Sequence, residues 1–188
     1  REQLIAAAFW ASAATDAFNV AFRIPNLLRR LFAEGAFSQA FVPILAAARE
    51  REGDAATHKL IDAVASVLAW ALLITCAVGM TGAPVLVWLI GSGLQEFDLA
   101  ATMTRWMFPY IAFMSLVALS AGILNTWNRF VVPAVTPVLL NLAVIAAAWW
   151  GAPLFKGWGL NPVLALAAGV MLGGLLQAAI QIPALRAI

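Results

Sequence analysis

The chain has 188 residues, of which 64% are hydrophobic and only 11% are charged, and its mean hydropathy is +0.93. Soluble domains are about 45–50% apolar and about 25% charged, and one of this size could not hide so much apolar surface from water. The small net charge of +2, without a basic run, gives no sign of a nucleic-acid partner. A single cysteine and a single histidine give neither a disulfide framework nor metal-ligand spacing. The composition therefore predicts a membrane protein.

Apolar runs long enough to cross a bilayer, which takes about 20 residues, recur along the chain between polar or Gly/Pro-containing breakers. The predicted spans are 1–14 (partial, its start absent), 16–48, 60–90, 100–126, 131–152 and 162–182. Residues 46–59 are the most hydrophilic segment and are predicted to form a loop. The sequence thus predicts an all-α fold: a polytopic transmembrane bundle of about six helices over 1–188, the first one truncated.

The predicted loops alternate in charge. Lys and Arg residues concentrate in residues 49–59, in the turn at 125–129 and after the last span. Loops rich in Lys and Arg stay on the cytoplasmic side of a membrane. We therefore expect these three segments to be cytoplasmic, and the turn at 12–15 and the loops at 91–98 and 153–162 to face outward.

The second predicted span contains several charged residues that are expensive at membrane depth, about 2.5–3.5 kcal/mol for Arg, Lys or Asp at a helix centre. At 100° per residue, one stripe of an ideal helix collects most of its polar side chains. The residues of this stripe are Asp16, Asn19, Arg23, Arg30, Glu34 and Ser38. The opposite side is predicted to hold Phe18, Phe22, Leu27, Leu31 and Val42. Arg29 falls off the stripe, although Pro25 can bend the helix.

A polar stripe at membrane depth predicts a helix that lines a wet path, and its excess of arginine indicates an anionic cargo. Arginine suits a diphosphate because its planar fork donates two hydrogen bonds to phosphate oxygens. Simpler interpretations remain open: the arginines can snorkel, Arg30 can pair with Glu34 at i+4, and Asp16 can cap the helix. These residues alone indicate a transporter of an anionic amphiphile.

The same segment resembles the MurJ/MviN lipid II flippase family. The matching strings are TDAFNVAFRIPNLLRRLFAEGAFSQAFVPIL (15–45), FPYI (108–111), ILNTWNRFVVPAVTPVLLN (123–141) and, more weakly, GGLLQAAIQIPAL (173–185). The resemblance implies one lobe of a two-lobe transporter of the multidrug/oligosaccharidyl-lipid/polysaccharide exporter superfamily, with the C-terminal lobe missing from this chain. It further implies alternating access that moves lipid II across the bacterial cytoplasmic membrane, among membrane lipids and without a cofactor.

The resemblance also assigns roles to individual residues. The family's substrate cavity positions match Arg1, Glu2, Asp16, Arg29, Glu34 and Ser38. Glu2 stands where the family usually has the shorter aspartate. Arg29 rather than Arg23 is thereby expected to bind the diphosphate, against the ideal wheel, and Arg23 and Arg30 are expected to supply secondary cavity charge.

Three other functions are weighed against this one. A flippase for another polyprenyl-diphosphate glycan is the nearest alternative, and the 15–45 string disfavours it. The chain could also be a channel or a non-transporting membrane scaffold, and a scaffold would not need Arg1, Arg29 and Glu34 at membrane depth. An enzyme is not expected, because no nucleophile–base pair or metal-ligand set is visible.

Overall fold

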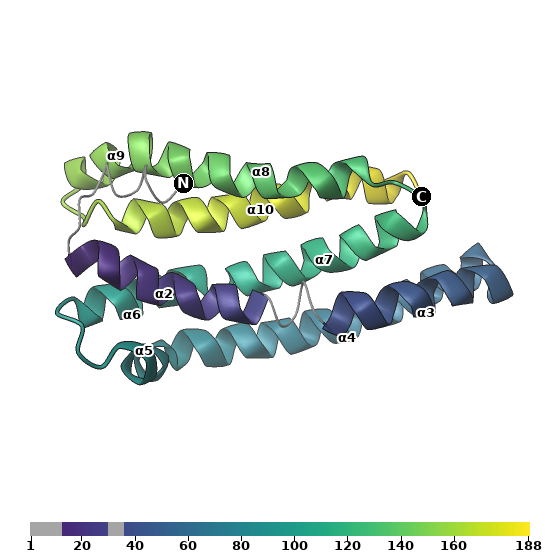
Figure 1. Ribbon diagram of the computed structural model, residues 1–188, viewed down its shortest axis with the longest axis horizontal. Coiled ribbons are helices and arrows are strands. Elements are labelled where there is room, and N and C mark those ends of the chain that lie inside the picture. Colours follow the sequence, from purple (N-terminus) through teal and green to yellow (C-terminus); the bar gives the residue numbers. More distant parts are fainter. Residues whose placement is uncertain (1–12, 30–35) are drawn as a thin grey trace.

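The computed structural model describes residues 13–29 and 36–188, and all regular structure in these residues is helical (Figure 1). The elements are α2 (Ala13–Arg29), α3 (Ala36–Glu52), α4 (Asp54–Thr81), α5 (Ala83–Gly91), α6 (Phe97–Met107), α7 (Tyr110–Thr126), α8 (Val131–Ala146), the π-helical turn η2 (Ala147–Gly151), α9 (Ala152–Gly157) and α10 (Leu164–Arg186). The predicted all-α class is confirmed.

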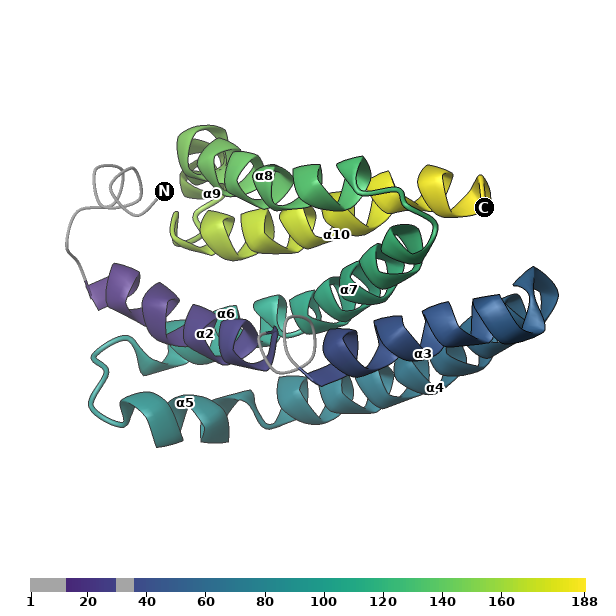
Figure 2. The same ribbon diagram turned by 45° about the vertical axis from the view of Figure 1, so that its right-hand side comes forward.

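The long helices lie side by side along the long axis of the molecule in two layers. One layer contains α8, η2 and α9 beside α10, and α10 packs in turn on α7 (Figures 1 and 2). In the other layer α2 lies against α6, and α3 packs on both α4 and α7. Helix α2 belongs to this second layer, and its buried residues Phe18 and Ala21 share a core cluster with residues of α8 and α10.

The turns gather at the two ends of the bundle. The α3–α4 turn, the α7–α8 turn and the end of α10 share one end, whereas the α5–α6 and α9–α10 turns share the other with the start of α2 (Figure 1). These are the two groups of segments that the Lys/Arg distribution separates. Which group faces the cytoplasm stays a prediction.

Four stretches of helix are long and apolar enough to cross a membrane: Asp54–Thr81, Phe97–Thr126, Val131–Gly157 and Leu164–Arg186. Prolines divide two of the predicted spans. Pro84 and Pro109 have no N–H to donate to the carbonyl four residues earlier, so α4 gives way to α5 near Gly82 and α6 gives way to α7 at Phe108–Pro109.

The prediction of a loop over residues 46–59 is wrong. Helix α3 runs on to Glu52, and α4 begins at Asp54, so only Gly53 is non-helical. Gly53 adopts φ 79°, a conformation that costs a glycine little and other residues more. Hydrophilicity marks where a span leaves the lipid, but the helical backbone continues into water. The predicted span at 16–48 is described as α2 and α3, and residues 30–35 between them lie outside the described residues.

Arg49 fastens the α3–α4 turn to the end of α7. Its Nε donates to a carboxylate oxygen of Asp54 at 3.0 Å, and its Nη1 donates to the backbone carbonyl of Thr126 at 2.9 Å. The guanidinium carbon also lies 4.5 Å from the ring centroid of Trp127. A cation at the carbonyl end of a helix is favourable because it complements the helix dipole.

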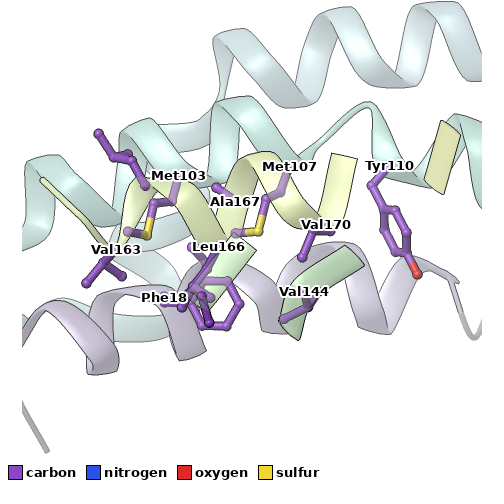
Figure 3. Packing of buried hydrophobic residues seen from close by; sticks show 12 residues of the cluster. Phe18, Met103, Met107, Tyr110, Val144, Val163, Leu166, Ala167 and Val170 are labelled. Carbon is purple, nitrogen blue, oxygen red and sulfur yellow. The ribbon is translucent and has the colours of Figure 1, made fainter. Parts of the chain in front are cut away.

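The main core lies where α2, α6 and α10 meet. Phe18, Met103, Met107, Leu166 and Val170 are buried there together (Figure 3). The helices α8 and α10 approach each other closely, because glycine stands on α10 at the contact. A Cβ at Gly173 would lie 3.1 Å from the Cα of Leu140 on α8, and one at Gly169 would lie 2.5 Å from the Cβ of Ala147 in η2. Small residues of this kind let helices pack tightly inside a membrane.

Candidate functional site

The described part of the predicted polar stripe lies on the surface of α2. Asp16, Asn19 and Arg23 are exposed, whereas Ala17 and Ala21 are fully buried. The spacing of the exposed residues, i, i+3 and i+7, follows one side of a helix. The stripe is held outward because the other side of α2 is anchored in the core.

Aromatic packing fixes this orientation of α2. Phe18 is buried, and its ring stacks on that of Phe22 with centroids 5.8 Å apart. Phe22 in turn lies 6.4 Å from the ring of Tyr110 on α7. Leu27, which was predicted to lie on this apolar side, is 62% exposed. It follows Arg23 by four residues and therefore lies only about 40° from it on the helix.

The prediction that a membrane span begins with α2 places Arg23 well inside the membrane. With a rise of about 1.5 Å per residue, it lies roughly 15 Å along the axis from the start of α2, which is about half of a 30 Å hydrocarbon core. Within residues 13–29 and 36–188 the single ion pair joins Arg49 and Asp54, so neither Asp16 nor Arg23 has a charged partner there. An exposed charge at this depth requires water, an anion or another protein surface beside it.

The other predicted site residues stay untested. Arg29 is the last residue of α2, and Ser38 lies in the first turn of α3, but their side chains are outside the described residues. The described residues do not include Arg1, Glu2, Arg30 or Glu34. The convergence of these six residues with Asp16 on one cavity therefore remains a prediction.

A cavity of about 510 Å³ lies between α2, α7, α8 and α10. Its volume falls within the range of about 300–1,000 Å³ typical of small-molecule sites. The polar residues that line it are Asn26, Thr136, Asn141, Gln177 and Gln181, and Phe22 and Tyr110 contribute aromatic rings. Among the described residues, no charged side chain lines this cavity.

Two glutamines of α10 bind α8 at the wall of the cavity. The Nε2 of Gln177 donates to the backbone carbonyl of Thr136 at 2.9 Å, and the Nε2 of Gln181 donates to the Thr136 hydroxyl at 3.3 Å. Both glutamines are buried, with 1% and 0% exposure. The sequence analysis missed them. The sequence feature that could have identified them is a pair of amide side chains at i and i+4 inside the apolar string GGLLQAAIQIPAL.

The described residues contain no group of three or more His, Cys, Asp or Glu side chains that could hold a metal ion. The chemistry that the two sites offer is therefore charge on α2 and neutral hydrogen bonding in the cavity.

Comparison with known proteins agrees with both the fold and the sequence strings. Residues 5–188 match the family described as "Lipid II flippase MurJ". The chain is 57% identical over 190 residues to the "Lipid II flippase MurJ" of Burkholderia cenocepacia, covering 99% of this chain and 36% of that protein. It is 42% identical over 197 residues to the "Probable lipid II flippase MurJ" of Haemophilus influenzae, covering 99% and 38%.

A solved structure shares the architecture as well. The "Lipid II flippase MurJ, inward closed conformation" superimposes with a TM-score of 0.73 and 28% sequence identity over 94% of this chain and 37% of that one. The chain thus spans little more than a third of the length of these relatives. Since the family match extends over nearly the whole chain and the fold agrees with it, the chain belongs to the lipid II flippase MurJ family of membrane proteins.

Proposed function

We propose that the full-length protein moves lipid II, the undecaprenyl-diphosphate-linked precursor of peptidoglycan, across the bacterial cytoplasmic membrane, and that this chain is its N-terminal lobe. The observation that supports this most directly is the exposed stripe of Asp16, Asn19 and Arg23 on α2. A membrane protein that only needs to be anchored gains nothing from an arginine at mid-depth, and Arg23 has no charged partner among the described residues. A carrier of an anionic head group does, because the head group must lose water inside the membrane.

The arrangement of the helices is compatible with transport by alternating access. Helix α2 packs on α6 and α7 with one side, and its charged residues Asp16 and Arg23 are exposed on the other side. In transporters built from two helical bundles, the substrate lies between the bundles, which rock against each other about it. A second lobe facing α2 would close a cationic cavity around the diphosphate while the polyprenyl tail stays in lipid. Catalysis forms no part of this proposal.

Reconstitution of the full-length protein tests this function. Proteoliposomes that contain lipid II in the inner leaflet should expose it to an external head-group reagent much faster than protein-free liposomes do. A polyprenyl glycan without the diphosphate serves as the matched substrate and should not be accelerated. Exposure of lipid II at the rate of empty liposomes would contradict the proposal.

A further inference from the structure

The buried apolar residues fall into clusters that belong to different groups of helices. The main core joins α2, α6, α8, the start of α7 and the first half of α10 (Figure 3). A second cluster joins α3 and α4 to the second half of α7, and its buried members are Phe41, Leu45, Leu119 and Ile123 (Figure 2). Among the described residues, these two clusters have no member in common. The packing thus distinguishes a main body from a hairpin body, which consists of α3, α4 and the second half of α7.

Polar contacts join the three helices of the hairpin body to one another at the end that is far from the main core. Arg49 of α3 donates both to Asp54 at the start of α4 and to the carbonyl of Thr126 at the end of α7. His58 of α4 lies with its ring centroid 5.8 Å from that of Trp127. Because each helix contacts the other two, a displacement of one carries the others with it.

Two helix breaks connect the hairpin body to the rest of the lobe. Helix α4 passes into α5 at Gly82, which Pro84 follows, and α6 passes into α7 at Phe108 and Pro109. Each proline lacks the N–H that would bond to the carbonyl four residues earlier, so both breaks have lost a hydrogen bond that stiffens a continuous helix. Bending at these two points costs less than bending elsewhere along α4 or α7.

The two breaks are neighbours in space. The ring of Phe108 packs on the backbone of α4 at Gly79, where a Cβ would overlap the ring. Side chains form the ridges that interlock packed helices, and Gly79 has none to oppose a rotation of the ring. Phe108 is buried in a third cluster that includes residues of both groups of helices: Leu72, Val87 and Ala100. This contact has the position and the smooth surface of a pivot.

The side of α7 that faces α8 and α10 borders open volume. The cavity of about 510 Å³ runs along α7, where its lining consists of Tyr110, Met114, Val117, Ala118 and Ala121. Protein interiors are otherwise packed about as densely as organic crystals. A helix that borders a cavity over three turns can therefore shift toward it without displacing packed side chains.

The end of α10 can follow such a shift. Leu185 and Ile188 pack against the second cluster, and Nη2 of Arg129 donates to the carbonyl of Ala187 at 3.1 Å. Pro183 lies inside α10 just before these residues. Because a proline weakens a helix at its position, the last turn of α10 can move with the hairpin body while the first half stays in the main core.

We propose that the hairpin body pivots on the main body about Gly82 and Phe108–Pro109, and that this motion changes the width of the substrate path. Helix α2, which carries Arg23, belongs to the main body. Helix α3, which carries the predicted site residue Ser38, belongs to the hairpin body. A pivot between the bodies therefore changes the distance between the two parts of the predicted polar stripe. The role in transport rests on the proposed function, whereas the division into two bodies rests on packing alone.

Distances between spin labels in the full-length protein test the pivot. With the native cysteines replaced, Ala55→Cys and Leu172→Cys place one label on each body, whereas Ala55→Cys and Val78→Cys place both labels on α4. All three positions are exposed. We expect the first pair to give a broad distribution of distances or two maxima, and the second pair to give a single narrow maximum.

A variant that stiffens one break links the pivot to transport. Pro109 has φ −62° and ψ −15°, which alanine adopts readily, and Pro109→Ala supplies an N–H for the carbonyl of Arg105. It should narrow the distribution of the first label pair. It should also slow lipid II exposure roughly fivefold, because the bent state must then break one more hydrogen bond. Pro43→Ala removes an exposed proline from inside α3, away from both breaks, and is the matched control that should change neither measurement.

The outcomes separate the pivot from the function. Equally narrow distributions for the two label pairs would overturn the pivot, and so would a distribution of the first pair that Pro109→Ala leaves unchanged. Wild-type rates of lipid II exposure by Pro109→Ala, or equal slowing by Pro43→Ala, would overturn its role in transport. If the wild-type protein shows the broad distribution but does not accelerate lipid II exposure, the proposed function fails and the pivot is retained.

Discussion

At the scale of single residues, the charged side chains of α2 and α3 differ in their surroundings. Asp16 and Arg23 are exposed on a helix whose other side is buried. Arg49, by contrast, has a carboxylate, a helix-terminal carbonyl and an indole ring around it. An arginine with such partners contributes to structure, whereas Arg23, which has no charged partner among the described residues, suits the substrate contact that we propose.

The arginines of α2 should differ in their effect on function. We expect Arg29→Ala in the full-length protein to abolish complementation of a flippase-depleted strain, and Arg29→Lys to rescue it poorly, because lysine lacks the planar fork that binds phosphate oxygens in pairs. Arg23→Ala should be milder, since we assign it general cavity charge. Membrane levels of each variant are the control. Normal growth with Arg29→Ala together with failure of Arg23→Ala would show that the helical wheel chose the right residue.

Periodicity predicted which side of α2 is exposed, whereas the role of the exposed residues as a binding site stays a prediction. It placed Asp16, Asn19 and Arg23 on one side of a helix, and the structure exposes all three. It could not find the cavity, because Gln177 and Gln181 in an apolar span are equally typical of hydrogen bonds between helices. Their unpaired oxygens become visible only when Thr136 of α8 is placed opposite them.

At the scale of elements, the contact between α8 and α10 depends on glycine. A Cβ at Gly173 would lie 2.8 Å from Cδ1 and 3.1 Å from Cα of Leu140, and one at Gly169 would meet Ala147 and the Ala143 carbonyl. Backbone atoms and a Cβ cannot turn aside as the end of a long side chain can. The two helices must therefore separate to accept even a methyl group there.

Substitution of Gly169 by alanine should destabilise the full-length protein. We expect Gly169→Ala to lower the free energy of unfolding by about 1–3 kcal/mol, as overpacking of a tight core does, and thus to lower the midpoint of thermal unfolding in detergent. Gly93→Ala is the matched control, because a Cβ there meets nothing within 4 Å. Equal midpoints for the two variants would show that α8 and α10 are not in close contact.

The ends of the elements were harder to predict than their existence. A hydropathy pattern predicts that a span ends where charged residues begin. Helix α3 nevertheless continues to Glu52, because the backbone hydrogen bonds of a helix form in water as well as in lipid. The breaks that hydropathy missed are backbone effects. Gly53 turns the chain with a positive φ, and Pro84 and Pro109 interrupt the hydrogen bonds of longer spans.

At the scale of the whole molecule, the charges at the two ends of the bundle predict which side of the membrane each end faces. The end with the α3–α4 turn contains Arg49, Arg51 and Lys59, and the end with the α5–α6 turn contains Glu96 and Asp98 (Figure 2). Since lysine and arginine are retained in the cytoplasm, the first end should be cytoplasmic and the second periplasmic.

Thiol labelling in intact cells measures this orientation. In the full-length protein, with Cys76→Ala as background and any other native cysteine replaced, we expect Ser92→Cys to react with an impermeant reagent added outside. Ala55→Cys should react only after the cells are opened. Both positions are exposed in the structure, so access to water is matched. Labelling of Ala55→Cys from outside would reverse the topology.

The last prediction concerns the chain by itself. Asp16 and Arg23 of α2 are exposed, and in the mechanism that we propose they lie on one wall of a path whose other wall is a second bundle. Alternating access of the proposed kind requires a second bundle that moves against the first about a shared site. We therefore expect the isolated chain to insert into liposomes without accelerating the exposure of lipid II. The full-length protein, assayed in parallel in the same lipids, is the positive control. Rapid lipid II exposure by the chain alone would show that one bundle is sufficient and would refute a mechanism that depends on two lobes.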